Sequence, residues 1–198
     1  GVRKMALGKQ AKVLSKGQQE AILAYLTGTR YAARNRVIFL LSVKAGLRAK
    51  EIAGLTWGMV TDSEGQIADK IALTDTASKG RSGRAIWTQK ELRRALEELQ
   101  SLASVAGADH VVRTERSERA TAQVMVNLLA SWYSRLGFEG CSSHSGRRTF
   151  ITNAARKISL VGGSLRDVQV MAGHAALGTT QRYIESDAEA QKRVVEMI

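Results

Sequence analysis

Several residue types that would point to particular classes of protein are scarce or missing. The 198-residue sequence has a single cysteine, Cys141, so an internal disulfide and a cysteine-based zinc site are both excluded. Its apolar runs fall short of the roughly eighteen residues that a bilayer-spanning helix needs. Residues 1–16 are basic and lack the apolar segment of a signal peptide. We therefore expect a soluble protein of the reducing cytoplasm, with no membrane partner, no metal and no other cofactor.

Proline is absent, so glycine and the Ser, Thr, Asn and Asp class must end the helices and form the turns. No Pro- or Ser-rich linker divides the chain, and no internal repeat or low-complexity tract is visible. The sequence therefore predicts an N-terminal tail or linker over residues 1–14 and one domain over residues 15–198.

Acidic residues are too few to balance the basic ones. The chain has 30 Lys and Arg against 18 Asp and Glu, a formal net charge of +12. The excess is spread along the sequence and forms no tail, which predicts a folded basic surface for a polyanion such as nucleic acid. A basic protein without such a partner is the alternative that charge alone leaves open.

Helical periodicity is the main structural signal. Ser15 and Gln18 form a capping-box pattern ahead of apolar residues at helical spacing that continue to Gly28. A strongly apolar helix is predicted over residues 32–45, with Gly46 placed to end it in a left-handed conformation. Such a helix would lie in the core.

A short β region interrupts the helices. Residues 66–73 and 84–88 contain β-favouring side chains, and the turn sequence 78–83 lies between them. The remaining helices are expected over residues 89–105, 120–136, 143–157, 164–172 and from 187 to the end. The predicted fold class is mainly α with a small antiparallel β-sheet (α+β).

Polar residues gather in places where core packing does not require them. Arg48 opens a helix after the Gly46 stop, and Glu51 follows one turn later. This pair is either an ordinary surface ion pair or a carboxylate that holds a guanidinium ready for a phosphate. His144 and Arg147 share one face of a helix start, where backbone N–H groups favour an anion.

Two further candidates are weak when taken singly. Lys79 lies in the turn between the expected strands, and an exposed lysine is common in such a turn. His174 follows a glycine and precedes Tyr183 by nine residues, and such a tyrosine is usually half-buried packing.

Taken in order, these residues resemble a known signature. The series Arg48, Lys79, His144, Arg147, His174, Tyr183 is similar to the Arg-Lys-His-x-x-Arg-His-Tyr set of tyrosine recombinases of the phage integrase type. The similarity runs from about residue 15 to the end and implies the catalytic-domain fold of that family. Full-length members usually carry an N-terminal core-binding helical domain that has no counterpart here, so we expect a fragment or a naturally short member.

The resemblance also contains departures. Gly146 stands where an apolar residue is common, which would loosen that helix start, and the spacing from His144 favours Arg147 over Arg148 as the phosphate ligand. Residues 85–87 lack the proline often found in the family's hairpin.

The resemblance implies a mechanism without metal or ATP. Tyr183 would attack a phosphodiester to form a 3′-phosphotyrosine, Arg48 and Arg147 would hold the phosphoryl oxygens, and Glu51 would orient the arginines. His144 would accept the tyrosine proton, His174 would donate to a phosphoryl oxygen, and Lys79 would protonate the leaving 5′-oxygen. Further DNA contacts are assigned to Lys50, Arg81, Arg84, Arg148 and Arg182.

The implied function is site-specific recombination, as in integration or excision. The implied partner is double-stranded DNA. The protein would act as a homo-tetramer on DNA, and a monomer is one alternative for its state without DNA. Residues 187–198 are either a helix exchanged between protomers or a packed terminus. The implied origin is bacterial or phage, with action at the nucleoid.

Other functions fit less well. A type IB topoisomerase shares the phosphotyrosine chemistry, and a DNA-binding module with an inactive site also remains open. A metal nuclease is disfavoured because Asp62, Asp69 and Asp75 form no convincing ligand set. A serine hydrolase is disfavoured because the sequence has no G-x-S-x-G turn.

Overall fold

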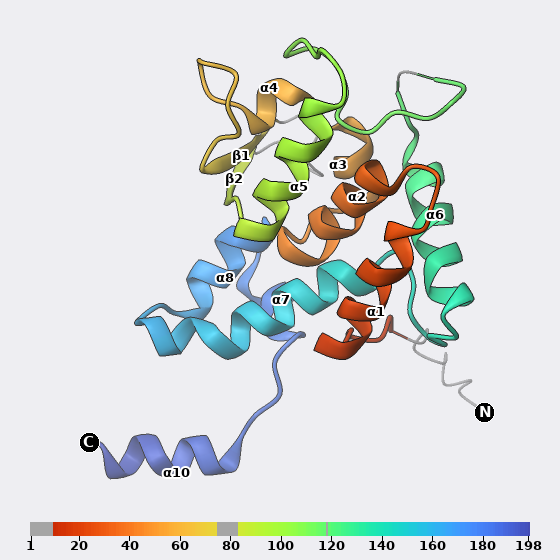
Figure 1. Cartoon of the computed structure of the whole chain (residues 1–198). Coiled ribbons are helices and arrows are strands. Elements are labelled where there is room, and N and C mark those ends of the chain that lie inside the picture. The colour runs from red at the N-terminus through yellow and green to blue at the C-terminus, as the bar shows by residue number, and fades with distance from the viewer. Residues whose placement is uncertain (1–9, 75–82, 118) are drawn as a thin grey trace, which may run out of the picture. The chain divides into compact units, whose positions relative to one another are not determined.

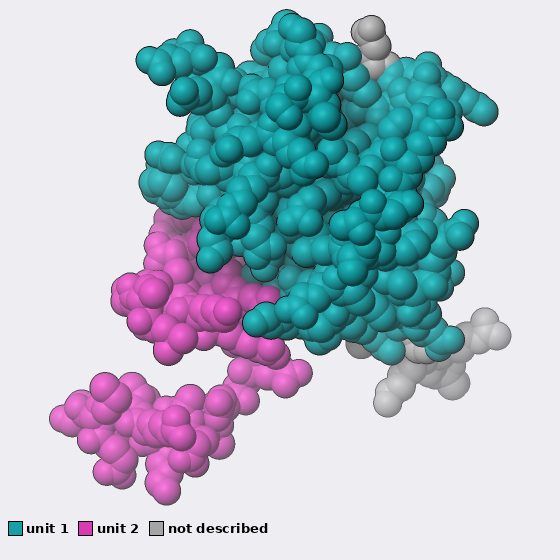
Figure 2. Space-filling view, viewed as in Figure 1, with its two compact units in different colours: residues 1–150 teal, residues 151–198 magenta. Residues whose placement is uncertain are grey.

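A computed structural model describes residues 10–74, 83–117 and 119–198, and Figure 1 shows its elements. The chain forms two compact units, Gly1–Phe150 and Ile151–Ile198, drawn in teal and magenta in Figure 2. No helix in the described part of the chain is long and apolar enough to cross a membrane.

The first unit is built around one buried helix, α2 (Ala32–Lys44). The side chains from Val37 to Leu41 are fully buried on every side of this helix, which is the pattern of a central core element. Helix α2 packs against α1 (Lys16–Thr27), α3 (Ala49–Gly54) and α5 (Lys90–Ser101). Helix α6 (Ala122–Arg135) packs on α3.

Local sequence explains where these helices begin. The predicted capping box is present, because the Ser15 hydroxyl accepts from the Gln18 N–H and the Gln18 side chain accepts from the Ser15 N–H. Helix α5 starts after Gln89 and α6 after Thr121, whose side chains accept hydrogen bonds from the first turn. Gly46 has a φ of 68°, the left-handed conformation expected after α2.

The small antiparallel sheet is also confirmed, with shorter strands than predicted. Strands β1 (Lys70–Leu73) and β2 (Arg84–Trp87) pair so that Ile71 faces Ile86, and both isoleucines are buried. The predicted first strand began at residue 66, but Ile67 forms a bridge with Thr61 after the short helix α4 (Trp57–Val60). Ile67 therefore pairs with Thr61 and is not part of strand β1.

The prediction for α5 was too long at its C-terminal end. The helix ends at Ser101 instead of residue 105. The segment that follows turns towards α4, where the Gly58 N–H donates to the carbonyl of Gly107 at 2.8 Å. The helix α4 itself was not predicted.

Residues of the predicted tail contact the first unit. Leu14 is buried, its N–H donates to the Thr149 hydroxyl at 2.8 Å, and the Lys12 N–H donates to the carbonyl of Gly140 at 3.0 Å. The division of the chain at residue 15 stays a prediction.

The second unit is a series of short helices. It contains most of α7 (Ser145–Lys157), the 3₁₀ helix η1 (Ile158–Val161), α8 (Leu165–Ala172), α9 (Leu177–Gln181) and α10 (Ala188–Glu196). A capping box joins Ser164 and Asp167 at the start of α8, and Gly173, with a φ of 70°, ends it. Helices α8 and α9 pack together, whereas α10 has no buried residue. Helix α9 was not predicted, because no side-chain cap precedes it.

Candidate functional site: an arginine cluster and a histidine-tyrosine pair

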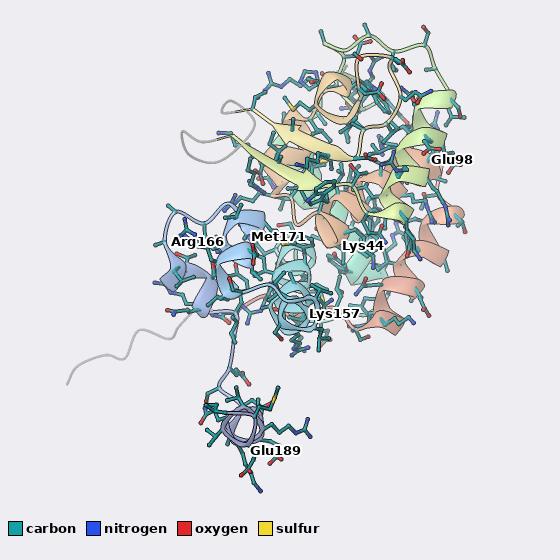
Figure 3. The ribbon with its side chains drawn as sticks, turned by 90° about the vertical axis from the view of Figure 1, so that its left-hand side faces the viewer. Lys44, Glu98, Lys157, Arg166, Met171 and Glu189 are labelled. Atoms are coloured by element: carbon teal, nitrogen blue, oxygen red, sulfur yellow. The ribbon has the colours of Figure 1, made fainter. Side chains whose placement is uncertain are left out.

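The loop between α2 and α3 places Arg48 at the start of a helix. Figure 3 labels Lys44, the last residue of α2, and Gly46 follows two residues later with its left-handed φ. Arg48 is the extended N-cap of α3, and its backbone N–H donates to Glu51 Oε1 at 2.9 Å. The carboxylate thus satisfies one of the N–H groups at the helix start and opposes its positive end.

Glu51 is fully buried and is shared by two arginines. Arg84 donates from both terminal nitrogens, Nη1 to Oε2 and Nη2 to Oε1, the second at 3.0 Å. Arg48 Nη1 lies 3.6 Å from Oε1. A buried carboxylate needs such partners, because leaving it unpaired costs about 3–5 kcal/mol. Two guanidinium groups against one carboxylate leave a net positive charge, which suits an anion.

Arg147 meets the same loop from α7. Its side chain is buried, and its Nη1 donates to the carbonyl of Gly46 at 2.8 Å. Arg147 is therefore anchored two residues from Arg48, although the two are far apart in sequence. Arg148, the next residue of α7, is half-buried. The choice of Arg147 over Arg148 as the phosphate ligand stays a prediction.

Gly146 has a different role from the expected one. The sequence suggested a loosened helix start, but Gly146 is buried against α2. An added Cβ would lie 1.9 Å from Ser42 Oγ and 2.8 Å from Ser42 Cβ. Glycine therefore lets α7 approach α2 closely, and this approach brings Arg147 to Gly46.

His144 lies in a tight turn just before α7. The Ser142 N–H donates to Ser145 Oγ at 2.9 Å, and the His144 N–H donates to Ser142 Oγ at 3.2 Å. The turn leaves the His144 side chain exposed to solvent at the helix start. An exposed imidazole there is accessible to a substrate.

The second unit contains the other two chemical groups. The rings of His174 and Tyr183 are stacked, with centroids 5.7 Å apart and an interplanar angle of 23°. His174 Nδ1 lies 2.8 Å from the hydroxyl oxygen of Thr180, which is fully buried. Thr180 belongs to α9 and also contacts Tyr183, because the Tyr183 N–H donates to the Thr180 carbonyl at 3.0 Å. This one residue therefore contacts both His174 and Tyr183. Thr180 was missed from the sequence because a threonine in a short helix carries no distinctive signal.

The remaining predicted residues differ in their surroundings. Lys79 and Arg81 lie outside the described residues. Lys50 and Arg182 are exposed to solvent, whereas the Arg84 side chain is only 8% exposed. Their assignment as DNA contacts stays a prediction. Across residues 10–74, 83–117 and 119–198, no group of three His, Cys, Asp or Glu side chains is placed to hold a metal ion.

Comparison with known proteins supports the resemblance. Residues 12–190 match the model of the phage integrase family. The tyrosine recombinase XerC of Xylella fastidiosa is 28% identical over 194 residues, which cover 96% of this chain and 61% of that protein. The tyrosine recombinase XerD of Neisseria meningitidis serogroup B is 28% identical over 162 residues, covering 79% of this chain and 52% of that protein.

A solved structure is similar in fold. The Tn1549 transposon integrase, determined in complex with a circular intermediate DNA, superposes with a TM-score of 0.72 at 18% identity. The match covers 96% of this chain and 66% of the integrase chain. The chain thus spans between half and two thirds of the length of these similar proteins.

Proposed function

Since the chain belongs to the phage integrase family, we propose that it is the part of a site-specific DNA recombinase that cleaves and rejoins strands. The main support is that Arg48 and Arg147 are both held at the loop between α2 and α3. Arg147 donates to the Gly46 carbonyl of this loop, and the buried Glu51 contacts Arg48. Arginine pairs of this kind suit the non-bridging oxygens of a phosphodiester, because each guanidinium offers parallel N–H donors.

The proposed first step is an exchange of one phosphoester bond for another. Tyr183 Oη attacks the scissile phosphorus, the bond from phosphorus to the 5′-oxygen breaks, and a 3′-phosphotyrosine forms. Arg48 and Arg147 neutralise the charge that builds up on the phosphoryl oxygens. His144 takes the tyrosine proton, and Lys79 gives a proton to the leaving 5′-oxygen.

His174 is proposed to donate a hydrogen bond to a phosphoryl oxygen through Nε2. The support is the contact of Nδ1 with the Thr180 hydroxyl. When that hydroxyl donates to Nδ1, the ring proton resides on Nε2, which is the tautomer that a donor role requires.

The second step reverses the first with a different strand. The 5′-hydroxyl of a partner strand attacks the phosphotyrosine and releases Tyr183, so the bond energy is conserved and no ATP is consumed. Exchange between two duplexes requires several protomers, and we propose a tetramer on DNA. Val194, Val195 and Met197 support an exchanged C-terminal helix, because they are 54%, 64% and 84% exposed.

Trapping of the covalent intermediate tests this proposal. The protein is mixed with a labelled pool of nicked duplexes of randomised sequence, in which the cleaved end diffuses away and the phosphotyrosine cannot be resealed. We expect a protein-DNA adduct that survives denaturation, is absent in Tyr183→Phe and persists in the control Tyr25→Phe. An adduct in Tyr183→Phe would exclude this nucleophile, and DNA binding without any adduct would favour an inactive binding module.

A further inference from the structure

We propose that Arg84 is a positioning residue that fixes Glu51, and through Glu51 the arginine at the phosphate, and is not a contact to DNA. This inference rests on the proposed function. It assigns Arg84 a role that its place in a basic hairpin does not suggest, since arginines at such positions are expected to meet the DNA backbone.

The geometry of the ion pair is the first argument. Both terminal nitrogens of Arg84 donate to Glu51, one to each carboxylate oxygen. This two-point contact joins the first residue of β2 to the first turn of α3 across 33 positions of sequence. A two-point contact fixes the plane of the carboxylate as well as its position.

Burial is the second argument. The Arg84 side chain is 8% exposed and Glu51 is 0% exposed, while Arg48 is 26% exposed. A phosphate could reach the donating nitrogens of Arg84 only by breaking the ion pair and leaving a buried carboxylate without its main partner. Of the two arginines that share Glu51, Arg48 is the more accessible and is therefore the one that can meet the substrate while the ion pair stays intact.

The shared oxygen explains how Arg84 acts at a distance. Glu51 Oε1 accepts from Arg84 Nη2 at 3.0 Å and from the Arg48 N–H at 2.9 Å, and it lies 3.6 Å from Arg48 Nη1. Without Arg84, the carboxylate would satisfy its charge by drawing the Arg48 guanidinium towards itself. Arg48 would then be displaced from the phosphate while the protein still bound DNA through its exposed cations.

Two measurements on the full chain separate positioning from DNA contact. The first is the salt dependence of binding to a duplex of unrelated sequence, and the second is the rate of adduct formation with the nicked duplex pool. For Arg84→Gln we expect an unchanged salt slope and an adduct rate about 100-fold lower. For the exposed control Arg182→Gln we expect the slope to fall by about 0.9, the value for one lost phosphate contact.

Coupling to Glu51 distinguishes positioning from a general loss of folding. Each variant is first checked for cooperative thermal unfolding, and rates are measured well below its midpoint. The double variant Glu51→Gln/Arg84→Gln should be no slower than Arg84→Gln, because both changes break the same contact. Arg84→Lys should recover part of the rate, since it keeps the charge but loses the two-point contact.

The possible outcomes distinguish a failure of the positioning role of Arg84 from a failure of the proposed function. A reduced salt slope in Arg84→Gln, or an adduct rate equal to that of the wild type, would overturn the positioning role alone. Additive losses in the double variant would also overturn it. A wild-type protein that forms no adduct would overturn the proposed function, and the positioning role would fail with it.

Discussion

Arg147 is fastened to the loop that carries Arg48, because its Nη1 donates to the carbonyl of Gly46 at 2.8 Å, two residues before Arg48. The contact depends on two close approaches of the backbone. Gly46 lies against the ring of Phe150, and Gly146 lies against Ser42 of α2. Substitutions at these glycines therefore test how the site is assembled.

Gly46→Ala should be strongly destabilising. A Cβ at Gly46 would lie 2.3 Å from Phe150 Cδ1, and its φ of 68° is unfavourable for any side chain. Strain and overpacking together should lower the free energy of unfolding by about 2–5 kcal/mol, measured by urea denaturation. Gly65→Ala is the matched control, since its φ is 81° but nothing lies within 4 Å of the added atom. It should lose only about 1–2 kcal/mol, and equal losses in the two variants would argue against the packing role of Gly46.

Gly146→Ala tests the approach of α7 to α2. The added Cβ would overlap Ser42 Oγ at 1.9 Å, so α7 has to shift. We expect a loss of about 1–3 kcal/mol in the free energy of unfolding. Gly17→Ala, in the first turn of α1 with nothing within 4 Å, should instead raise stability by up to about 1 kcal/mol. If alanine were stabilising at both positions, the close contact with Ser42 would not exist in solution.

The local features of this fold could be predicted, because each is encoded within a few residues. The capping box of Ser15 and Gln18, the apolar helix α2 and the left-handed Gly46 all follow from short patterns. The fold class was confirmed for the same reason, since hydrophobic periodicity separates the helices from the small sheet.

Contacts between distant residues could not be predicted in this way. The sequence suggested Glu51 as a partner for Arg48 but carries no local sign that Arg84 would share the same carboxylate. Gly146 looked like a weak helix start because Ser42, the residue that requires the glycine, is more than a hundred positions away. The early end of α5 depends on the pairing of Gly58 with Gly107, which is again a tertiary contact.

His110 should make stability depend on pH. Its pKa is lowered from 6.5 by burial first, and then by the positive charges of Arg119 and Arg113. The folded state therefore binds the proton less readily than the unfolded chain, so stability is lost as the pH falls through about 6.5 towards the folded pKa. Between pH values of about 7.5 and 5.5, the free energy of unfolding of the wild type should therefore drop by more than that of His110→Gln. Parallel curves for the two proteins would show that His110 titrates alike in both states.

Thr180→Val should impair chemistry more than folding. The substitution keeps the shape of a fully buried side chain but removes the hydroxyl that lies 2.8 Å from His174 Nδ1. One lost hydrogen bond should cost about 1 kcal/mol of stability. The imidazole would lose both its orientation and its preferred tautomer, so adduct formation should slow by roughly 10- to 100-fold.

Thr179→Val is the matched control, because Thr179 belongs to the same helix and is only half-buried, and it should keep the wild-type rate. A wild-type rate in Thr180→Val would mean that the His174 ring is oriented without this hydroxyl, and the donor role assigned to Nε2 would lose its support.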